Sequence, residues 1–160
     1  MHTTDAGRDW SASPAPAPAV AFPSGQGTAG ASMSVRFADP MDGWIYAMNP
    51  ARVWSTHDGG KTWARVQSAG LTPSATITAM EASGGYVWVA VIPPGFTNVH
   101  LERSPVGTDS WTDIDTGVPV GAGPVPSTQL VLHGPDGWLL EDDRTVVGGL
   151  VPLGEEHGLS

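Results

Sequence analysis

A repeated pattern constrains this chain more than any other feature of its sequence. The segments Thr3–Trp10 and Thr56–Trp63 both read Thr-x-Asp-x-Gly-x-x-Trp. A third, weaker copy, Ser104–Trp111, keeps the hydroxyl residue and the tryptophan but has Val106 and Thr108 where Asp and Gly stand in the other two. Because self-similarity at a fixed period is typical of repeat architectures, the pattern predicts a fold assembled from copies of one small unit.

A second series of tryptophans supports the same period of about 47 residues. Trp44, Trp88 and Trp138 each close a Gly-Trp or Gly-Tyr-Val-Trp string, and they alternate along the chain with the tryptophans of the first series. Two interleaved series with one period indicate that the repeat is real.

Each repeat divides into four short segments with the character of strands. The segments are 32–37, 44–48, 52–55 and 62–67 in the best-defined repeat, and 75–81, 86–92, 99–103 and 111–114 in the next. Gly, Pro, Asn and Asp separate them, as in hairpins. The chain has 21 Gly and 15 Pro among 160 residues, which argues against helices. Four strands in about 47 residues is the size of one β-propeller blade.

We therefore expect an all-β fold, a partial β-propeller of four-stranded antiparallel blades over residues 1–147. The expected parts are the outer strand of one blade at about 1–12, blades at about 32–68 and 75–115, the start of a further blade at about 128–147, and a flexible Gly-rich tail at 148–160. This amounts to about 3.4 blades, below the usual four to eight. We thus expect a fragment, or a unit that self-associates to complete the propeller.

The charge and the residue composition exclude several classes of binding partner and site. Seven basic and sixteen acidic residues give a formal charge of −9, which fits neither a nucleic-acid binder nor a protein drawn to an anionic membrane surface. The absence of Cys excludes a disulfide framework and a thiolate zinc site. The chain shows no signal peptide and no apolar run long enough to span a bilayer, so we expect a soluble chain without membrane insertion.

The segment 56–63 resembles the Asp-box, the signature of BNR (sialidase-type) repeats. With the Gly-Trp strand that precedes this segment, the chain resembles the BNR-like β-propeller superfamily, which includes sialidases, xyloglucanases, sortilin-type receptors and photosystem II assembly-factor-like proteins. The resemblance implies that the boxes lie on the outer rim of the blades, away from the central ligand site. It also allows an extracytoplasmic location.

The residue types of the three boxes suit a structural role. A short Asp in a tight turn accepts several backbone N–H bonds, Gly tolerates a positive φ, and hydroxyls and a Trp ring close the loop. We assign this role to Thr3, Asp5, Gly7, Trp10, Thr56, Asp58, Gly60, Thr62, Trp63, Ser104, Ser110 and Trp111. None of these residues is expected to be catalytic.

An enzyme of the glycoside hydrolase class is the alternative. A sialidase needs a Tyr nucleophile with an acidic partner, and several Arg to hold the substrate carboxylate. The candidates Tyr46 and Tyr86 lie in apolar strands, where a packed core Tyr is expected, and the segment around Arg36 does not match the family's Arg-Ile-Pro motif. No spacing singles out the pair of Asp residues that a xyloglucanase would use.

Metal ligation has little support in the sequence. Asp109, Asp113 and Asp115 resemble an oxygen-rich calcium loop, but the twelve-residue EF-hand pattern ending in Glu is missing. The five His residues show no ligand spacing, and His57 is expected to be exposed on its loop. We expect no cofactor and no metal.

These observations predict a non-catalytic propeller that acts as a binding or assembly scaffold for a protein or carbohydrate ligand. A fragment of a sialidase- or xyloglucanase-type glycoside hydrolase remains the alternative.

Overall fold

The computed structural model describes residues 3, 5, 7–12, 33–48, 50–95, 97–120, 128–133, 136–141 and 151–152. These residues form strands joined by turns, and no helix occurs among them. The described ranges therefore hold no helix with the length and hydropathy that a membrane crossing requires.

The first sheet is a meander of four antiparallel strands. It consists of β1 (Met33–Phe37), β2 (Gly43–Ala47), β3 (Arg52–Thr56) and β4 (Ala64–Arg65). Each strand pairs with the next in the chain, so the order across the sheet is β1-β2-β3-β4. The hairpin of β1 and β2 closes tightly at Gly43, where an added Cβ would lie 2.5 Å from the ring of Phe37. We call this sheet the first blade.

The second sheet repeats this order and forms the second blade. Its strands are β5 (Thr76–Ser83), β6 (Tyr86–Ile92), β7 (Asn98–Pro105) and β8 (Thr112–Pro119), paired antiparallel in the order β5-β6-β7-β8. The two sheets confirm the predicted four-stranded antiparallel units.

The limits of the outermost strands differ from the sequence-based expectation. β4 has two residues, whereas the pattern predicts a strand over 62–67, and β8 extends to Pro119, whereas the pattern predicts an end at residue 114. The side chains of β4 and β8 are largely exposed. Because such strands bury few side chains, they carry a weak apolar signal from which to read their ends.

A third sheet is formed by β9 (Thr128–His133), β10 (Asp136–Glu141) and β11 (Val151–Pro152), in the order β11-β10-β9. β11 lies in the segment expected to be a flexible tail, and here the structure differs: Val151 pairs with Gly137 in an antiparallel ladder with β10. Pairing between strands depends on backbone hydrogen bonds, so the side chains of this Gly-rich segment give little indication of a strand. Residues 142–147 of the expected further blade, and the rest of the tail, lie outside the described residues.

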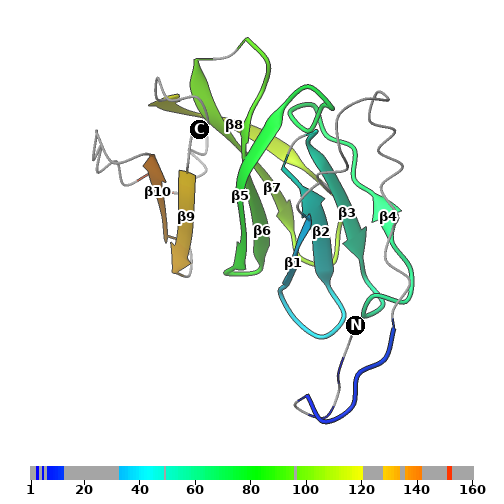
Figure 1. The fold of residues 1–160 in the computed structure, drawn as a ribbon. Coiled ribbons are helices and arrows are strands. Elements are labelled where there is room, and N and C mark those ends of the chain that lie inside the picture. The colour runs from blue at the N-terminus through cyan, green and yellow to red at the C-terminus, as the bar shows by residue number, and fades with distance from the viewer. Residues whose placement is uncertain are drawn as a thin grey trace, which may run out of the picture.

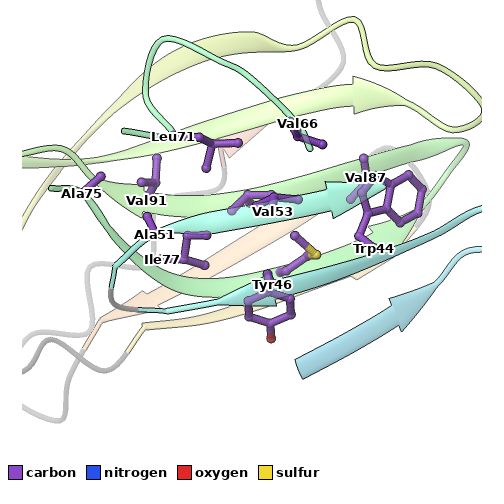
Figure 2. Close-up of a cluster of buried hydrophobic side chains, with 12 residues drawn as sticks. Trp44, Tyr46, Ala51, Val53, Val66, Leu71, Ala75, Ile77, Val87 and Val91 are labelled. Atoms are coloured by element: carbon purple, nitrogen blue, oxygen red, sulfur yellow. The ribbon is translucent and has the colours of Figure 1, made fainter. Parts of the chain in front are cut away.

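The three sheets stand side by side, with the second blade between the other two (Figure 1). The space between the first and second blades is filled by the cluster in Figure 2, which we call the first core. Its buried members are Trp44, Tyr46, Ala51, Val53, Val66, Leu71, Ala75, Ile77, Met80, Val87, Val89 and Val91. A second core between the second blade and the third sheet contains Trp88, Ala90, Val99, Leu101, Leu130 and Leu139.

β6 contributes to both cores because side chains alternate between the two faces of a strand. Val87, Val89 and Val91 enter the first core, and Trp88 and Ala90 enter the second. The second blade is therefore buried on both faces.

The first strands of the three sheets lie together: β1 contacts β5, and β5 contacts β9. From β1, the Nε of Arg36 donates to the carbonyl oxygen of Met80 at 3.3 Å, and its Nη2 pairs with Glu81 at 3.2 Å. Successive meanders that share this inner side have the arrangement of propeller blades. The described chain is thus an all-β partial propeller of two complete blades and part of another.

Replacing Ile77 by Ala tests the contribution of the first core. Ile77 is fully buried, so we expect Ile77→Ala to lower the free energy of unfolding by about 2–5 kcal/mol, from lost burial and from the cavity left behind. Val35, on β1 and 53% exposed, is the control: Val35→Ala should lower the free energy of unfolding by less than about 1 kcal/mol. Urea denaturation followed by circular dichroism measures both, and equal losses would contradict this assignment of the core.

Candidate functional site

The loop that joins β3 to β4, residues 56–63, is organised around the carboxylate of Asp58; we call it the Asp58 loop. Oδ1 of Asp58 accepts the backbone N–H groups of Lys61 and Thr62, both at 2.9 Å. Oδ2 accepts the hydroxyl of Thr62 at 2.6 Å. One short side chain therefore satisfies two backbone donors and one hydroxyl of a tight turn.

The other end of this loop is closed by Thr56. Its hydroxyl donates to Oδ1 of Asp58 at 2.8 Å and accepts the N–H of Gly60 at 2.9 Å. Gly60 has a φ of 84°, a backbone conformation that side chains with a Cβ rarely adopt. The pattern Thr-x-Asp-x-Gly thus corresponds to one ring of hydrogen bonds within the loop.

The hydrogen bonds to Asp58 also set its acidity. Donors stabilise the ionised carboxylate, and they hold the pKa of Asp58 far below its ordinary value, with the Thr62 hydroxyl contributing most and the Thr62 N–H next. Asp58 is therefore a charged acceptor at every physiological pH. Its oxygens are committed to the loop itself, which leaves this carboxylate poorly suited to proton transfer.

The described residues of the segment 3–10, which we call the Asp5 loop, make a similar set of hydrogen bonds. Asp5 accepts the N–H groups of Arg8 and Asp9, each at 3.0 Å, and the hydroxyl of Thr3 at 2.7 Å. The hydroxyl of Thr3 accepts the N–H of Gly7 at 2.9 Å. The pKa of Asp5 is lowered, first by the N–H of Asp9 and then by the Thr3 hydroxyl. Asp9 stands where the Asp58 loop has Thr62, so Asp5 lacks the hydroxyl bond that Thr62 gives to Asp58.

The tryptophans that close the three loops lie in different environments. Trp10 is 57% exposed, and its indole N–H donates to the carbonyl oxygen of Gly7 at 3.1 Å. Trp63 meets the ring of Phe37 edge-on, with 6.3 Å between the ring centroids. Trp111 packs against the first core. The indole N–H groups of Trp63 and Trp111 are buried without a hydrogen-bond acceptor.

The loop between β7 and β8, residues 104–111, closes without a carboxylate; we call it the Ser104 loop. The hydroxyl of Ser104 donates to the carbonyl oxygen of Thr108 at 3.1 Å. The hydroxyl of Thr108 donates to the carbonyl oxygen of Pro105 at 3.1 Å and lies 3.4 Å from the N–H of Ser110. Hydroxyls and backbone carbonyls here replace the Asp that the sequence lacks at Val106.

A polar cluster connects the Ser104 loop to the first blade. Asp109 accepts the hydroxyl of Ser55 at 2.8 Å and lies 3.5 Å from Nε2 of His57. The other ring nitrogen of His57 lies 2.5 Å from Asp42, in the turn between β1 and β2. The His57 side chain is 37% exposed, as its loop position predicts, but it also lies between two carboxylates.

A second polar group is fully buried between the blades. The carboxylate of Glu102 on β7 accepts the N–H of Gly70 at 2.7 Å and the hydroxyl of Ser68 at 2.5 Å. A Cβ at residue 70 would overlap this carboxylate, so any other residue there would displace it from its present position. Burial raises the pKa of Glu102, against the two donors that lower it. Glu102 thus fastens the segment that leads from the first blade to the second.

The three Asp residues that resemble a calcium loop in sequence face different partners. Asp109 contacts Ser55, and Asp113 lies 2.9 Å from Nδ1 of His100. Asp115 accepts the N–H of Gly117 at 2.9 Å and the Asn98 amide at 3.2 Å, and these bonds lower its pKa. Within the described ranges, no three His, Cys, Asp or Glu side chains are grouped so that they could hold a metal ion.

The two tyrosines considered as nucleophiles take part in packing. Tyr46 is 7% exposed and belongs to the first core. Tyr86 lies beneath the guanidinium of Arg103, which is 5.0 Å from the Tyr86 ring centroid and 5.2 Å from that of Trp88. These are cation–π contacts that hold aromatic rings in place.

The sequence alone does not predict the contacts that Glu102, Asp42 and Asp109 make. The available signal was weak: Glu102 directly follows Val99, His100 and Leu101, so a charged residue stands in a strand that also carries apolar ones. Its partners, Ser68 and Gly70, follow only from the way the blades pack.

Comparison with known proteins gives one structural similarity. No protein-family model matches the chain, and no curated protein sequence matches it. A solved structure, that of YCF48 bound to D1 peptide, aligns with a TM-score of 0.49 and 19% sequence identity over 67% of this chain. The aligned part covers 32% of that protein, so this chain spans about a third of its length.

Removing the carboxylate of Asp58 should destabilise the first blade. We expect Asp58→Ala to lower the Tm at pH 7 by about 5 °C, because backbone N–H groups lose their acceptor. The pKa of Asp58 is lower in the folded than in the unfolded chain, so its contribution is present above pH 3.8 and is lost as the pH falls below that value. The difference in Tm between the two proteins should therefore shrink towards pH 2.

Thermal melts between pH 2 and 7 measure this difference. Lys61→Ala is the control within the same loop, because only the backbone N–H of Lys61 contacts Asp58; it should change the Tm by less than about 2 °C. A difference between wild type and Asp58→Ala that stays constant down to pH 2 would contradict the assigned role.

Two substitutions of Glu102 separate its shape from its charge. Glu102→Ala should lower the free energy of unfolding by about 2–4 kcal/mol, because it leaves the Gly70 N–H without an acceptor and opens a cavity. Glu102→Gln keeps one acceptor oxygen for Gly70, and its amide can donate to the Ser68 hydroxyl, so we expect a change below about 1 kcal/mol. Urea denaturation at pH 7 measures the free energy of unfolding of both variants. Equal decreases in Glu102→Ala and Glu102→Gln would show that the charge itself is required.

Proposed function

We propose that this chain is part of a non-catalytic BNR-like β-propeller that serves as a binding or assembly scaffold. In this proposal residues 1–147 belong to the propeller, and the Asp5, Asp58 and Ser104 loops are Asp-box hairpins on its outer rim. The observation that carries the proposal is the commitment of the most conspicuous carboxylate, Asp58, to donors of its own loop.

The packing of the tyrosines supports a role without catalysis. A retaining sialidase needs a Tyr whose hydroxyl reaches the sugar. Tyr46 instead fills the first core, and Tyr86 stacks beneath Arg103. Each ring thus has a structural role in the blade that carries it.

The inner side of the propeller is the surface proposed for a ligand. The first strands β1 and β5 meet there, and Arg36 on β1 keeps a side chain that is 49% exposed beside Glu81. A guanidinium at this position can donate hydrogen bonds to a carboxylate or to sugar hydroxyls. The ligand class is accordingly a protein segment or a carbohydrate.

Two measurements on the purified chain test the proposal. With a fluorogenic sialoside and with xyloglucan oligosaccharides, we expect no release of product above that of heat-denatured protein. Release that disappears in Tyr86→Phe or Tyr46→Phe would overturn the proposal in favour of a glycoside hydrolase.

Binding is measured on glycan and peptide arrays with the labelled chain. Arg36→Ala should weaken binding at the inner side, whereas Arg65→Ala, on the exposed outer strand β4, is the matched control and should leave binding unchanged. Equal effects of the two variants would place the ligand elsewhere. Light scattering on the same sample determines whether copies of the chain associate.

A further inference from the structure

His57 occupies the junction between the first and second blades. It lies in the Asp58 loop of the first blade, and its Nδ1 is 2.5 Å from Oδ1 of Asp42 in the turn between β1 and β2. Its Nε2 is 3.5 Å from Oδ2 of Asp109, in the Ser104 loop of the second blade. Each ring nitrogen therefore faces a carboxylate, and the two carboxylates belong to different blades.

Backbone hydrogen bonds hold the first-blade side of this junction. Asp39 accepts the N–H groups of Met41 and Asp42 at 2.7 and 2.9 Å, which sets the turn that carries Asp42. The N–H of Gly59 donates to the carbonyl oxygen of Met41 at 2.9 Å and fastens the Asp58 loop to the same turn. His57 and Asp42 thus keep their relative positions without depending on the second blade.

The second blade closes against this surface through its Ser104 loop. Asp109 accepts the hydroxyl of Ser55 at 2.8 Å. At Gly107, a Cβ would lie 3.9 Å from both carboxylate oxygens of Asp42, so this part of the loop lies close to that carboxylate. Asp42 is accordingly only 16% exposed.

The chemistry of imidazole makes this junction depend on a proton. Neutral imidazole has one N–H and one lone pair, so it can donate to only one of the two carboxylates and faces the other with a lone pair. Imidazolium has two N–H groups and a positive charge, which match Asp42 and Asp109 together. Among the residues that the structure describes, the charged groups that act on His57 are these two carboxylates, one from each blade.

We propose that His57 is a proton-operated latch between the first and second blades: the protonated ring joins Asp42 to Asp109, and loss of the proton releases the Ser104 loop at the outer end of the joint. This inference concerns the stability of the joint and does not depend on the proposed scaffold function.

The acidity of His57 agrees with this geometry. The hydrogen bond to Asp42, followed by that to Asp109, raises the pKa of His57 above 6.5. A group whose pKa is raised in the folded state contributes stability that is fully present below its unfolded value of 6.5 and is lost as the pH rises through the folded value. The latch therefore closes at mildly acidic pH and opens on the alkaline side.

The first test is an NMR titration of the His57 ring in the full chain. We expect a pKa above 6.5 in the wild type and a decrease towards 6.5 in Asp109→Asn, because one of the two flanking charges is removed. Asp115→Asn, which removes the same charge further along β8, is the matched control and should leave the titration of His57 unchanged. If the pKa of His57 in Asp109→Asn equals that of the wild type, the proposal is wrong.

The second test measures the junction itself. The Tm advantage of the wild type over His57→Gln should be larger at pH 5.5 than at pH 8.5, and it should be smaller in the Asp109→Asn background, where only the contact of His57 with Asp42 remains. Hydrogen exchange, corrected for its intrinsic dependence on pH, should show weaker protection of residues 105–111 at pH 8.5 in the wild type and no such change in His57→Gln. A Tm advantage that is equal at the two pH values, or that is undiminished in the Asp109→Asn background, would sink the proposal.

Discussion

The burial of both faces of the second blade is the constraint on which the other features depend. β6 places Val87, Val89 and Val91 on one face and Trp88 and Ala90 on the other, so this sheet cannot leave either face in water without exposing large apolar side chains. The first blade packs against one face of the second blade, and the third sheet packs against the other. Sheets that stack through both faces are stable only as neighbours, which is why a chain of short hairpins becomes an ordered array rather than a set of independent units.

The hairpin loops solve a different problem, the satisfaction of backbone polar groups at the outer ends of the sheets. In the Asp58 loop one carboxylate and one threonine hydroxyl serve the donors of a turn that has no ladder partner. These bonds join residues at most four positions apart, so the loop can form without help from a neighbouring blade. The apolar cores, in contrast, exist only where two sheets meet.

This division explains how much of the molecule can be predicted from its sequence. The four-stranded units follow from turn residues and alternating apolar positions, which are local signals. β11 does not, because its two residues are recruited by pairing with β10 and carry no periodic pattern of their own. Glu102 and Asp109 escape prediction for a related reason: the N–H of Gly70 lies 32 residues from Glu102, the hydroxyl of Ser55 lies 54 residues from Asp109, and no spacing rule connects them.

The Ser104 loop departs furthest from the repeated pattern, and it is also the loop whose Asp109 contacts the neighbouring blade. In a linear array the total stability divides into the intrinsic stability of each unit and the coupling between adjacent units. Because position 106 holds Val instead of Asp, this loop contributes less to the intrinsic stability of its own blade. Through Asp109 it contributes instead to the coupling between the two blades. A chain in which every loop matched the consensus would consist of more self-sufficient units held by weaker junctions, and its unfolding would separate into steps instead of occurring as one transition.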